Sequence, residues 1–396
     1  MFVNKNKKAP ESVKDLIQFS TFTNFPNVSF KLLGFLTILD INLHQTKIQK
    51  TINFISKMYY FMVSLNILIS SCGMLTAAFV NSNDLIILTT ILSTCSVEFL
   101  LFIKTLSFWY NQAKFRYVLM MLQELFPKTI EHQQKYKVKA YAKKFVLFKV
   151  VFLVTSLIMG LVYIFAPLIT NFFTGVWTYR LPFEIWLPIN VLHPDNYFYV
   201  YVWQIWVMHI SEFVMIGTDL LVCATITLLS MEFDFLQQDL KDLKVNFGFH
   251  DYKHMNLLIE RQNTLITLSN KLNVILSPII LLNLMSNTIN IGLGGFIFTT
   301  EVEIWNIIKY GLYLNTCILE CGMFCFFGNK LIDGSAGVGD GAYNCEWYKM
   351  KDARIKKGLQ LIILRSQTPC QLTAMKFTKL SLETFYKVII QNSVYI

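Results

Sequence analysis

The chain has 396 residues, of which 54% are hydrophobic and only 15% are charged, and its formal net charge is +10. Because a soluble domain carries about 25% charged residues, this composition argues against an ordinary soluble protein and predicts a membrane protein. No basic, aromatic-interleaved module is present, which argues against nucleic-acid binding and assigns the positive charge to cytosolic connections.

The segment 1–27 is polar and contains lysines, without the apolar core of a cleavable signal peptide. We therefore expect residues 1–51 to form a cytosolic N-terminal segment.

A membrane-spanning helix needs about 20 mostly apolar residues. The candidate segments are 52–80, 85–108, 145–170, 198–229, 274–298, 305–332 and 380–396. They predict an all-α membrane protein with seven transmembrane helices, of which the last is short and needs neighbours. Apolar residues continue at helical spacing through 231–243 and 255–276. We therefore expect helices that extend into the cytosol and form a packed anchor bundle.

The basic residues predict the orientation of these helices. Lysine and arginine gather in 1–51, 109–144, 230–273 and the anchor segment 333–379, whereas the alternate connections contain only Arg180. Because basic connections stay in the cytosol, the N-terminus is expected inside and the C-terminus outside. This orientation is opposite to that of a G-protein-coupled receptor.

Sequence patterns for catalysis and metal binding are weak. The string Gly337-Val338-Gly339-Asp340 matches the GxGD of intramembrane aspartyl proteases, whose chemistry needs two facing carboxylates. Here Asp340 is expected in a loop after the sixth helix, without a partner. A set of three cysteines at helical spacing is better interpreted as small packing residues than as metal ligands: Cys317, Cys321 and Cys325. We therefore predict no enzyme, no metal site and no cofactor.

Two groups of residues inside the predicted spans could carry a function. Four carboxylates, Glu98, Glu212, Asp219 and Glu320, indicate either a transport or channel role or polar contacts between helices. The outer halves of the helices also contain aromatic, methionine and small polar residues that could line an apolar pocket, although spacing alone favours ordinary packing. These candidates are Thr89, Thr90, Ser156, Met159, Gly160, Tyr163, Trp203, Tyr310 and Tyr313.

Several blocks of the second half resemble the insect odorant receptor family. Leu181-Pro182-Phe183 precedes a Trp-Leu-Pro triplet, and the run 219–237 resembles the family's exit from helix four. The end of helix six at 327–331 and the block 365–385 resemble the family's C-terminal signature, and the last block is the most specific. The family's topology agrees with the orientation that the loop charges predict.

The resemblance implies a subunit of an odorant-gated, non-selective cation channel, in which four subunits surround one pore. The connection 229–272 is short, whereas the family's co-receptor has a long insertion there, so the chain resembles an odorant-specific subunit that assembles with co-receptor subunits. It implies the plasma membrane of an olfactory neuron dendrite and a small hydrophobic volatile ligand. A gustatory receptor and a secondary transporter remain as alternatives.

The resemblance also implies roles for C-terminal residues. The ligand pocket is expected in the outer half of helices two, three, four and six, among the candidates above. The segment 380–396 is expected to line the pore with one stripe of its helix: Val388, Gln391, Asn392 and Tyr395. Contacts with partner subunits are expected through the cytosolic helices and the start of helix seven: Trp347, Leu359, Ile363, Phe377 and Phe385.

Overall fold

The computed structural model describes residues 16–34, 47–175, 177–190, 193–243, 249–300, 304–350 and 352–393. These residues are largely helical, which confirms the predicted all-α class. The described elements are α2 (Ser20–Leu32), α3 (Lys47–Val80), α4 (Leu85–Tyr110), α5 (Gln112–Leu125), α6 (Ile130–Lys135), α7 (Val138–Thr174), α8 (Pro194–Lys241), α9 (Phe249–Thr300), α10 (Ile304–Tyr343), the short helix η1 (Trp347–Lys349), α11 (Ala353–Ser366), β1 (Thr373–Ala374), β2 (Thr378–Lys379) and α12 (Leu382–Ser393).

Within the described residues, six helices are long and apolar enough to cross a membrane: α3, α4, α7, α8, α9 and α10. They coincide with the first six spans that hydropathy predicts. The seventh, α12, is described over 12 residues, which corresponds to about 18 Å of helix at the usual rise. It follows a two-residue antiparallel ribbon of β1 and β2, in which Thr373 pairs with Lys379.

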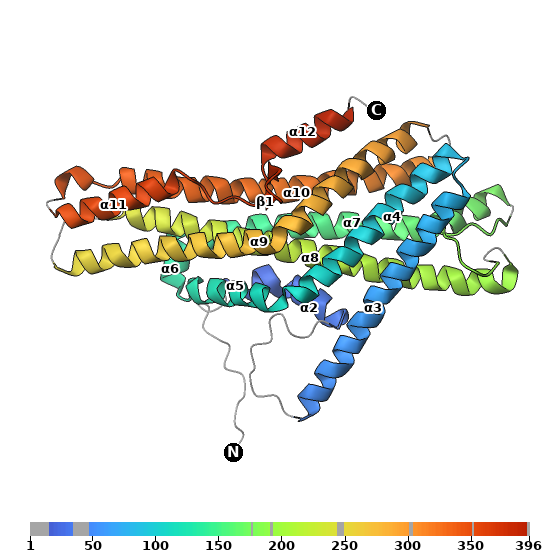
Figure 1. Cartoon of the computed structure of the whole chain (residues 1–396), viewed down its shortest axis with the longest axis horizontal. Helices are drawn as coiled ribbons and strands as arrows, with labels where there is room; N and C mark the ends of the chain where they lie inside the picture. The colour runs from blue at the N-terminus through green and yellow to red at the C-terminus, as the bar shows by residue number, and fades with distance from the viewer. Residues whose placement is uncertain are drawn as a thin grey trace, which may run out of the picture.

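The helices form an elongated bundle in which α8, α9 and α10 run along the long axis (Figure 1). One end carries the 81–84 turn and the 177–190 loop, and we call it the loop end. The opposite end carries α11, and we call it the α11 end. The most apolar window of α8 is 94% buried, whereas that of α7 is only 22% buried. Helix α7 is the more apolar of the two, with a mean hydropathy of 2.5 against 1.9. Helix α8 therefore forms the core, and α7 presents its apolar surface outward, as lipid contact requires.

Two predicted helical extensions are confirmed. Helix α8 continues without a break to Lys241, and α9 begins at Phe249, well before its most apolar part. At the α11 end, the side chain of Gln262 in α9 donates hydrogen bonds to the Ile362 carbonyl at 3.2 Å and to Ser366 Oγ at 3.0 Å. These bonds fasten α11 to α9, so the extensions and α11 form the packed bundle that the sequence predicts.

The glycine-rich segment around Asp340 corrects the sequence analysis. It was expected to form a loop after residue 332, but it lies inside α10, which continues to Tyr343. A Cβ atom at Gly341 would lie 2.6 Å from the carbonyl oxygen of Gln237 in α8. Glycine therefore lets the two helix backbones approach closely, and this packing outweighs its poor helix propensity. The predicted domain limits at 51/52 and 332/333 accordingly fall inside α3 and α10.

Candidate functional site

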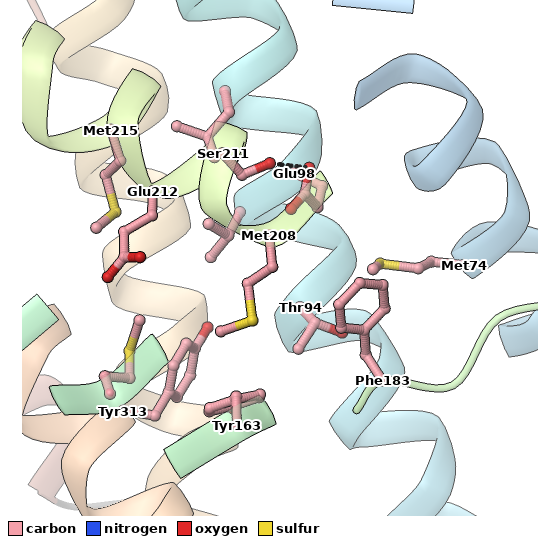
Figure 2. A pocket seen from close by; sticks show the side chains of 13 residues that line it. Met74, Thr94, Glu98, Tyr163, Phe183, Met208, Ser211, Glu212, Met215 and Tyr313 are labelled. Carbon is pink, nitrogen blue, oxygen red and sulfur yellow. Dashed lines mark hydrogen bonds between the residues drawn. The ribbon is translucent and has the colours of Figure 1, made fainter. Parts of the chain in front are cut away.

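A cavity between the membrane-spanning helices lies near the loop end, and α3, α4, α7, α8, α10 and the 177–190 loop all contribute to its wall (Figure 2). About 610 Å³ among these residues is free of protein atoms, and part of this space opens outward. Its lining residues are Met74, Thr94, Val97, Glu98, Leu101, Met159, Tyr163, Phe183, Met208, Ser211, Glu212, Met215 and Tyr313.

The wall of the cavity is mainly sulfur and aromatic. Four methionines reach it from three helices, namely Met74 in α3, Met159 in α7, and Met208 and Met215 in α8. Methionine is flexible and polarizable, so such a wall adapts to ligands of different shape. The rings of Tyr163 and Tyr313 lie 6.3 Å apart between centroids. The two rings therefore close the cavity on the side of α7 and α10.

The polar groups of the cavity are two carboxyls and the hydroxyls of Thr94, Ser211, Tyr163 and Tyr313. Ser211 donates a hydrogen bond from Oγ to Oε2 of Glu98 at 3.0 Å, which Figure 2 shows as the dashed contact between α8 and α4. The neighbouring Glu212 also points to the cavity, and its Oε1 is buried without a hydrogen-bond partner in the described part of the chain. Its Oε2 lies 3.5 Å from Nδ1 of the half-exposed His209.

The structure brings together some, but not all, of the residues that the sequence suggests for a pocket. Met159, Tyr163 and Tyr313 line the cavity. Gly160 lies behind it, where a Cβ atom would be 3.0 Å from both carboxyl oxygens of Glu212. The remaining candidates are absent from the lining of this cavity: Thr89, Thr90, Ser156, Trp203 and Tyr310.

Those remaining candidates have other contacts. Thr90 Oγ1 and the Tyr310 hydroxyl lie 3.4 Å apart and join α4 to α10. Thr89 donates to carbonyls of its own helix. Trp203 donates from Nε1 to Oδ1 of Asn66 at 3.4 Å, and Ser156 is buried in α7. Their described contacts connect helices or stay within one helix.

A second cavity adjoins the first, and two members of a buried ion-pair triad, Lys104 and Glu320, line it. The linings of the two cavities share Val97, Leu101, Met159, Met215 and Tyr313. Lys104 Nζ of α4 lies 2.7 Å from Oδ1 of Asp219 in α8 and 3.4 Å from Oε1 of Glu320 in α10. The lysine side chain is 1% exposed, so the triad joins three helices beneath the first cavity without solvent.

The triad explains two of the four intramembrane carboxylates, and sequence reasoning missed its cation. Lys104 lies deep within the predicted span 85–108, where a charge is expensive unless it is paired. The sequence did contain a signal for this triad. One lysine lies in an apolar run, and each of two other predicted spans contains an acid of opposite charge. Among the carboxylates, Glu98 and Glu212 therefore differ from Asp219 and Glu320, because only the second pair contacts a buried cation.

Comparison with known proteins decides the family. The family model described as 7tm Odorant receptor matches residues 84–392. The chain belongs to this odorant receptor family. Two similar relatives come from Drosophila melanogaster. Putative odorant receptor 92a is 25% identical over 398 residues, covering 97% of this chain and 95% of the relative. Odorant receptor 67c is 28% identical over 278 residues, covering 68% of each.

A solved structure shows the same fold. The insect olfactory receptor OR5 from Machilis hrabei, solved in complex with eugenol, matches this odorant receptor with a TM-score of 0.79 at 12% identity. The match covers 95% of this chain and 97% of the other. The predicted seven-helix fold is therefore confirmed, and the receptor is a multi-pass membrane protein. These relatives favour the odorant receptor assignment over the gustatory and transporter alternatives.

The residues expected to line a pore lie on α12 of the receptor. Gln391 is exposed, and Val388 is partly buried. Asn392 is 6% exposed and donates from Nδ2 to the Val388 carbonyl at 2.8 Å. A Cβ atom at Gly292 in α9 would lie 3.1 Å from Asn392 Oδ1, so this amide faces its own subunit. Tyr395 lies outside the described residues.

The residues expected at a subunit interface differ in exposure. Trp347 is 41% exposed and Phe377 is 82% exposed. Ile363 and Phe385 are partly buried against the core of the receptor, and Leu359 is 3% exposed within it. The exposed apolar face of α11 is instead formed by Leu361 and Leu364, at 41% and 64% exposure, which the sequence analysis did not single out.

Proposed function

We propose that the receptor is the odorant-binding subunit of a ligand-gated, non-selective cation channel. The observation that carries the proposal is a mostly apolar cavity between the helices of a member of the odorant receptor family. The fold supports it, because the similar OR5 structure is described as an olfactory receptor in complex with eugenol, a small organic molecule. The ligand of this receptor would be a small volatile molecule.

The proposed orientation places the cavity near the outer surface of the plasma membrane. The loop end contains the connections that are nearly free of lysine and arginine, and Phe183 of the 177–190 loop reaches the cavity. With the basic connections in the cytosol, a ligand would enter from outside, as expected at the dendrite of an olfactory neuron. The N-terminus would be cytosolic and the C-terminus extracellular.

The proposed partner is the odorant co-receptor, in a hetero-oligomer of four subunits. Exposed aromatic and aliphatic side chains of η1, α11 and the β1–β2 turn support such a contact, because apolar surface that is exposed outside lipid marks interaction sites. The exposed residues that we propose for it are Trp347, Leu361, Leu364 and Phe377, and the more buried Ile363, Phe385 and Leu359 would support them from the core.

Co-expression with the co-receptor tests this proposal together with the pocket. We expect cation current evoked by volatiles only when both chains are present. Met159→Trp should occupy part of the cavity and raise the half-maximal odorant concentration by at least about fivefold, because a bound ligand would then be overpacked at a cost of about 1–3 kcal/mol. Leu157→Trp is the matched control, since Leu157 is 47% exposed on the same helix. Equal dose–response curves for the two variants, with equal surface levels, would contradict the pocket assignment.

The pore is proposed to include the exposed face of α12, with Gln391 toward the conduction path and Asn392 toward α9. Gln391→Glu should add a carboxylate to a cation path and change single-channel conductance or block by divalent cations at least about twofold. Asn392→Asp is the matched control, because that amide is buried against its own subunit. Recordings in which only Asn392→Asp alters permeation would reverse the assignment of the two faces.

A further inference from the structure

Among the described residues, the two carboxyl groups of the first cavity form no ion pair with a lysine or arginine. Glu98 and Glu212 are each 8% exposed, and both line the cavity, whose lining contains no lysine, arginine or histidine. Two lysines of the surrounding helices have other partners. Lys104 pairs with Asp219 and Glu320, and the ammonium of Lys309 lies 4.3 Å from the centroid of the Tyr163 ring.

The geometry holds one of these carboxyls at the cavity wall. Both Glu212 oxygens lie where a Cβ atom at Gly160 would be 3.0 Å away, so the absence of a side chain at Gly160 makes room for the carboxyl group. Its Oε1 has no hydrogen-bond partner in the described part of the chain. The imidazole of His209, which is 43% exposed, lies 3.5 Å from the other oxygen. One oxygen therefore remains for a ligand.

The rest of the cavity suits a cation with apolar substituents. The aromatic face of Tyr313 attracts cations through its ring quadrupole, and the methionine side chains accommodate alkyl groups. A buried carboxylate is costly unless it is paired. A neutral hydrocarbon ligand would leave both acids without a counter-ion, whereas one ammonium group can hydrogen-bond to a carboxylate and rest against an aromatic ring.

We propose that the cavity binds a small protonated amine, with Glu212 as the main partner of the ammonium group and Glu98 as a second acid held by Ser211. This inference rests on the proposed odorant-binding function and specifies the chemical class of its ligand. A neutral carboxyl that donates to an oxygenated ligand is the competing arrangement, and it predicts the opposite preference between amines and alcohols.

The test compares amines with alcohols of the same carbon skeleton on the receptor expressed with the co-receptor. The probes are 3-methylbutylamine and 2-phenylethylamine, with 3-methylbutanol and 2-phenylethanol as neutral partners. We expect at least one amine to evoke current at a concentration about tenfold lower than its alcohol. We expect Glu212→Gln to remove this preference, because an amide cannot neutralise an ammonium group. Glu98→Gln should reduce it less.

Glu260→Gln is the matched control, because Glu260 is exposed in the part of α9 that lies toward the α11 end. Surface labelling establishes that each variant reaches the membrane. Thermal unfolding of the purified complex with each probe provides a readout that does not depend on gating, and amines should raise the midpoint of the unmodified receptor but not of Glu212→Gln.

Alcohols that act at equal or lower concentrations than their amines would overturn the inference while supporting the proposed function. The inference would also be overturned, and the proposed function supported, if neutral odorants evoked current while neither amine activated or stabilised the receptor. If no probe evokes current but an amine raises the unfolding midpoint in a Glu212-dependent manner, the amine site stands and the channel function fails. The absence of both current and stabilisation with every probe would overturn both.

Discussion

Replacing Lys104 with methionine is expected to destabilise the folded receptor by about 3–5 kcal/mol, the usual cost of removing one partner from a buried ion pair. The substitution preserves an unbranched side chain of similar length but leaves Asp219 and Glu320 without their cation. Both acids are buried beside the lysine, and Oδ2 of Asp219 already lacks a hydrogen-bond partner in the described part of the chain. The measurements are surface level and the thermal unfolding midpoint of the purified complex.

Lys57→Met is the matched control, because Lys57 is exposed on α3 and surface substitutions usually change stability by no more than about 0.5 kcal/mol. A triple variant, Lys104→Met with Asp219→Asn and Glu320→Gln, removes all three charges and should recover part of the loss. If Lys104→Met unfolded at the same temperature as Lys57→Met, the triad would not hold α4, α8 and α10 together.

Hydropathy was sufficient to predict the six long apolar helices of this chain, because it is a property of contiguous sequence. Each of the six spans is a long run of mostly apolar residues, and such a run is visible in the mean hydropathy of the sequence. The extension of α8 to Lys241 was also readable, since apolar spacing continues beyond the membrane-length segment. The sequence misled where packing outweighs local propensity. The glycines before Tyr343 resemble a loop, yet they form helix because α8 packs too closely for side chains there.

The site was predictable only in part, because it depends on which faces of distant helices meet. Tyr163 and Tyr313 are aromatic residues in predicted outer halves, and the fold places their rings side by side. Thr89 and Trp203 have equally suitable chemistry, but the rotation of their helices directs them to other contacts. No pattern within one segment distinguishes Glu212, which lines the cavity, from Asp219, which pairs with Lys104. The distinction depends on how α4, α8 and α10 pack against one another.

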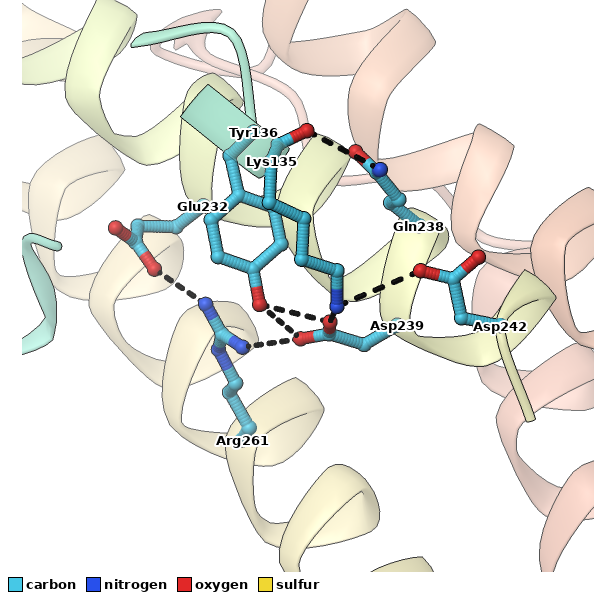
Figure 3. A network of polar contacts seen from close by, with 7 residues as sticks. All are labelled: Lys135, Tyr136, Glu232, Gln238, Asp239, Asp242 and Arg261. Carbon is cyan, nitrogen blue, oxygen red and sulfur yellow. Dashed lines mark hydrogen bonds and ion pairs between the residues drawn. The ribbon is translucent and has the colours of Figure 1, made fainter. Parts of the chain in front are cut away.

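The network around Arg261 leads to the second large effect that we expect. It joins α6, α8 and α9 toward the α11 end (Figure 3). Arg261 donates to Glu232 Oε2 at 2.8 Å from one terminal nitrogen and to Asp239 Oδ2 at 3.0 Å from the other. Asp239 also accepts from Lys135 at 2.6 Å and from the Tyr136 hydroxyl at 2.7 Å. Three donors from two other elements therefore converge on one carboxylate of α8.

The protonation of Tyr136 supports this arrangement. Burial, and then the hydrogen bond to Asp239, raise the pKa of the Tyr136 phenol above its ordinary value of 10.0. The phenol therefore remains a donor throughout the physiological range, and its ring stacks on Phe235 with centroids 4.3 Å apart. Loss of Arg261 would leave Asp239 with two donors, but it would leave Glu232, whose side chain is 1% exposed, without its ion pair.

Arg261→Met is therefore expected to lower the stability of the receptor by about 2 kcal/mol, the scale of a hydrogen bond to a charged group. Arg365→Met is the matched control, because Arg365 is exposed and its recorded side-chain bond is one to the Asn263 amide at 3.2 Å. The lower unfolding midpoint of Arg261→Met should be partly restored by Glu232→Gln, since the second substitution removes the buried unpaired charge. A midpoint that falls further in the double variant would show that Glu232 is stabilised by groups other than Arg261.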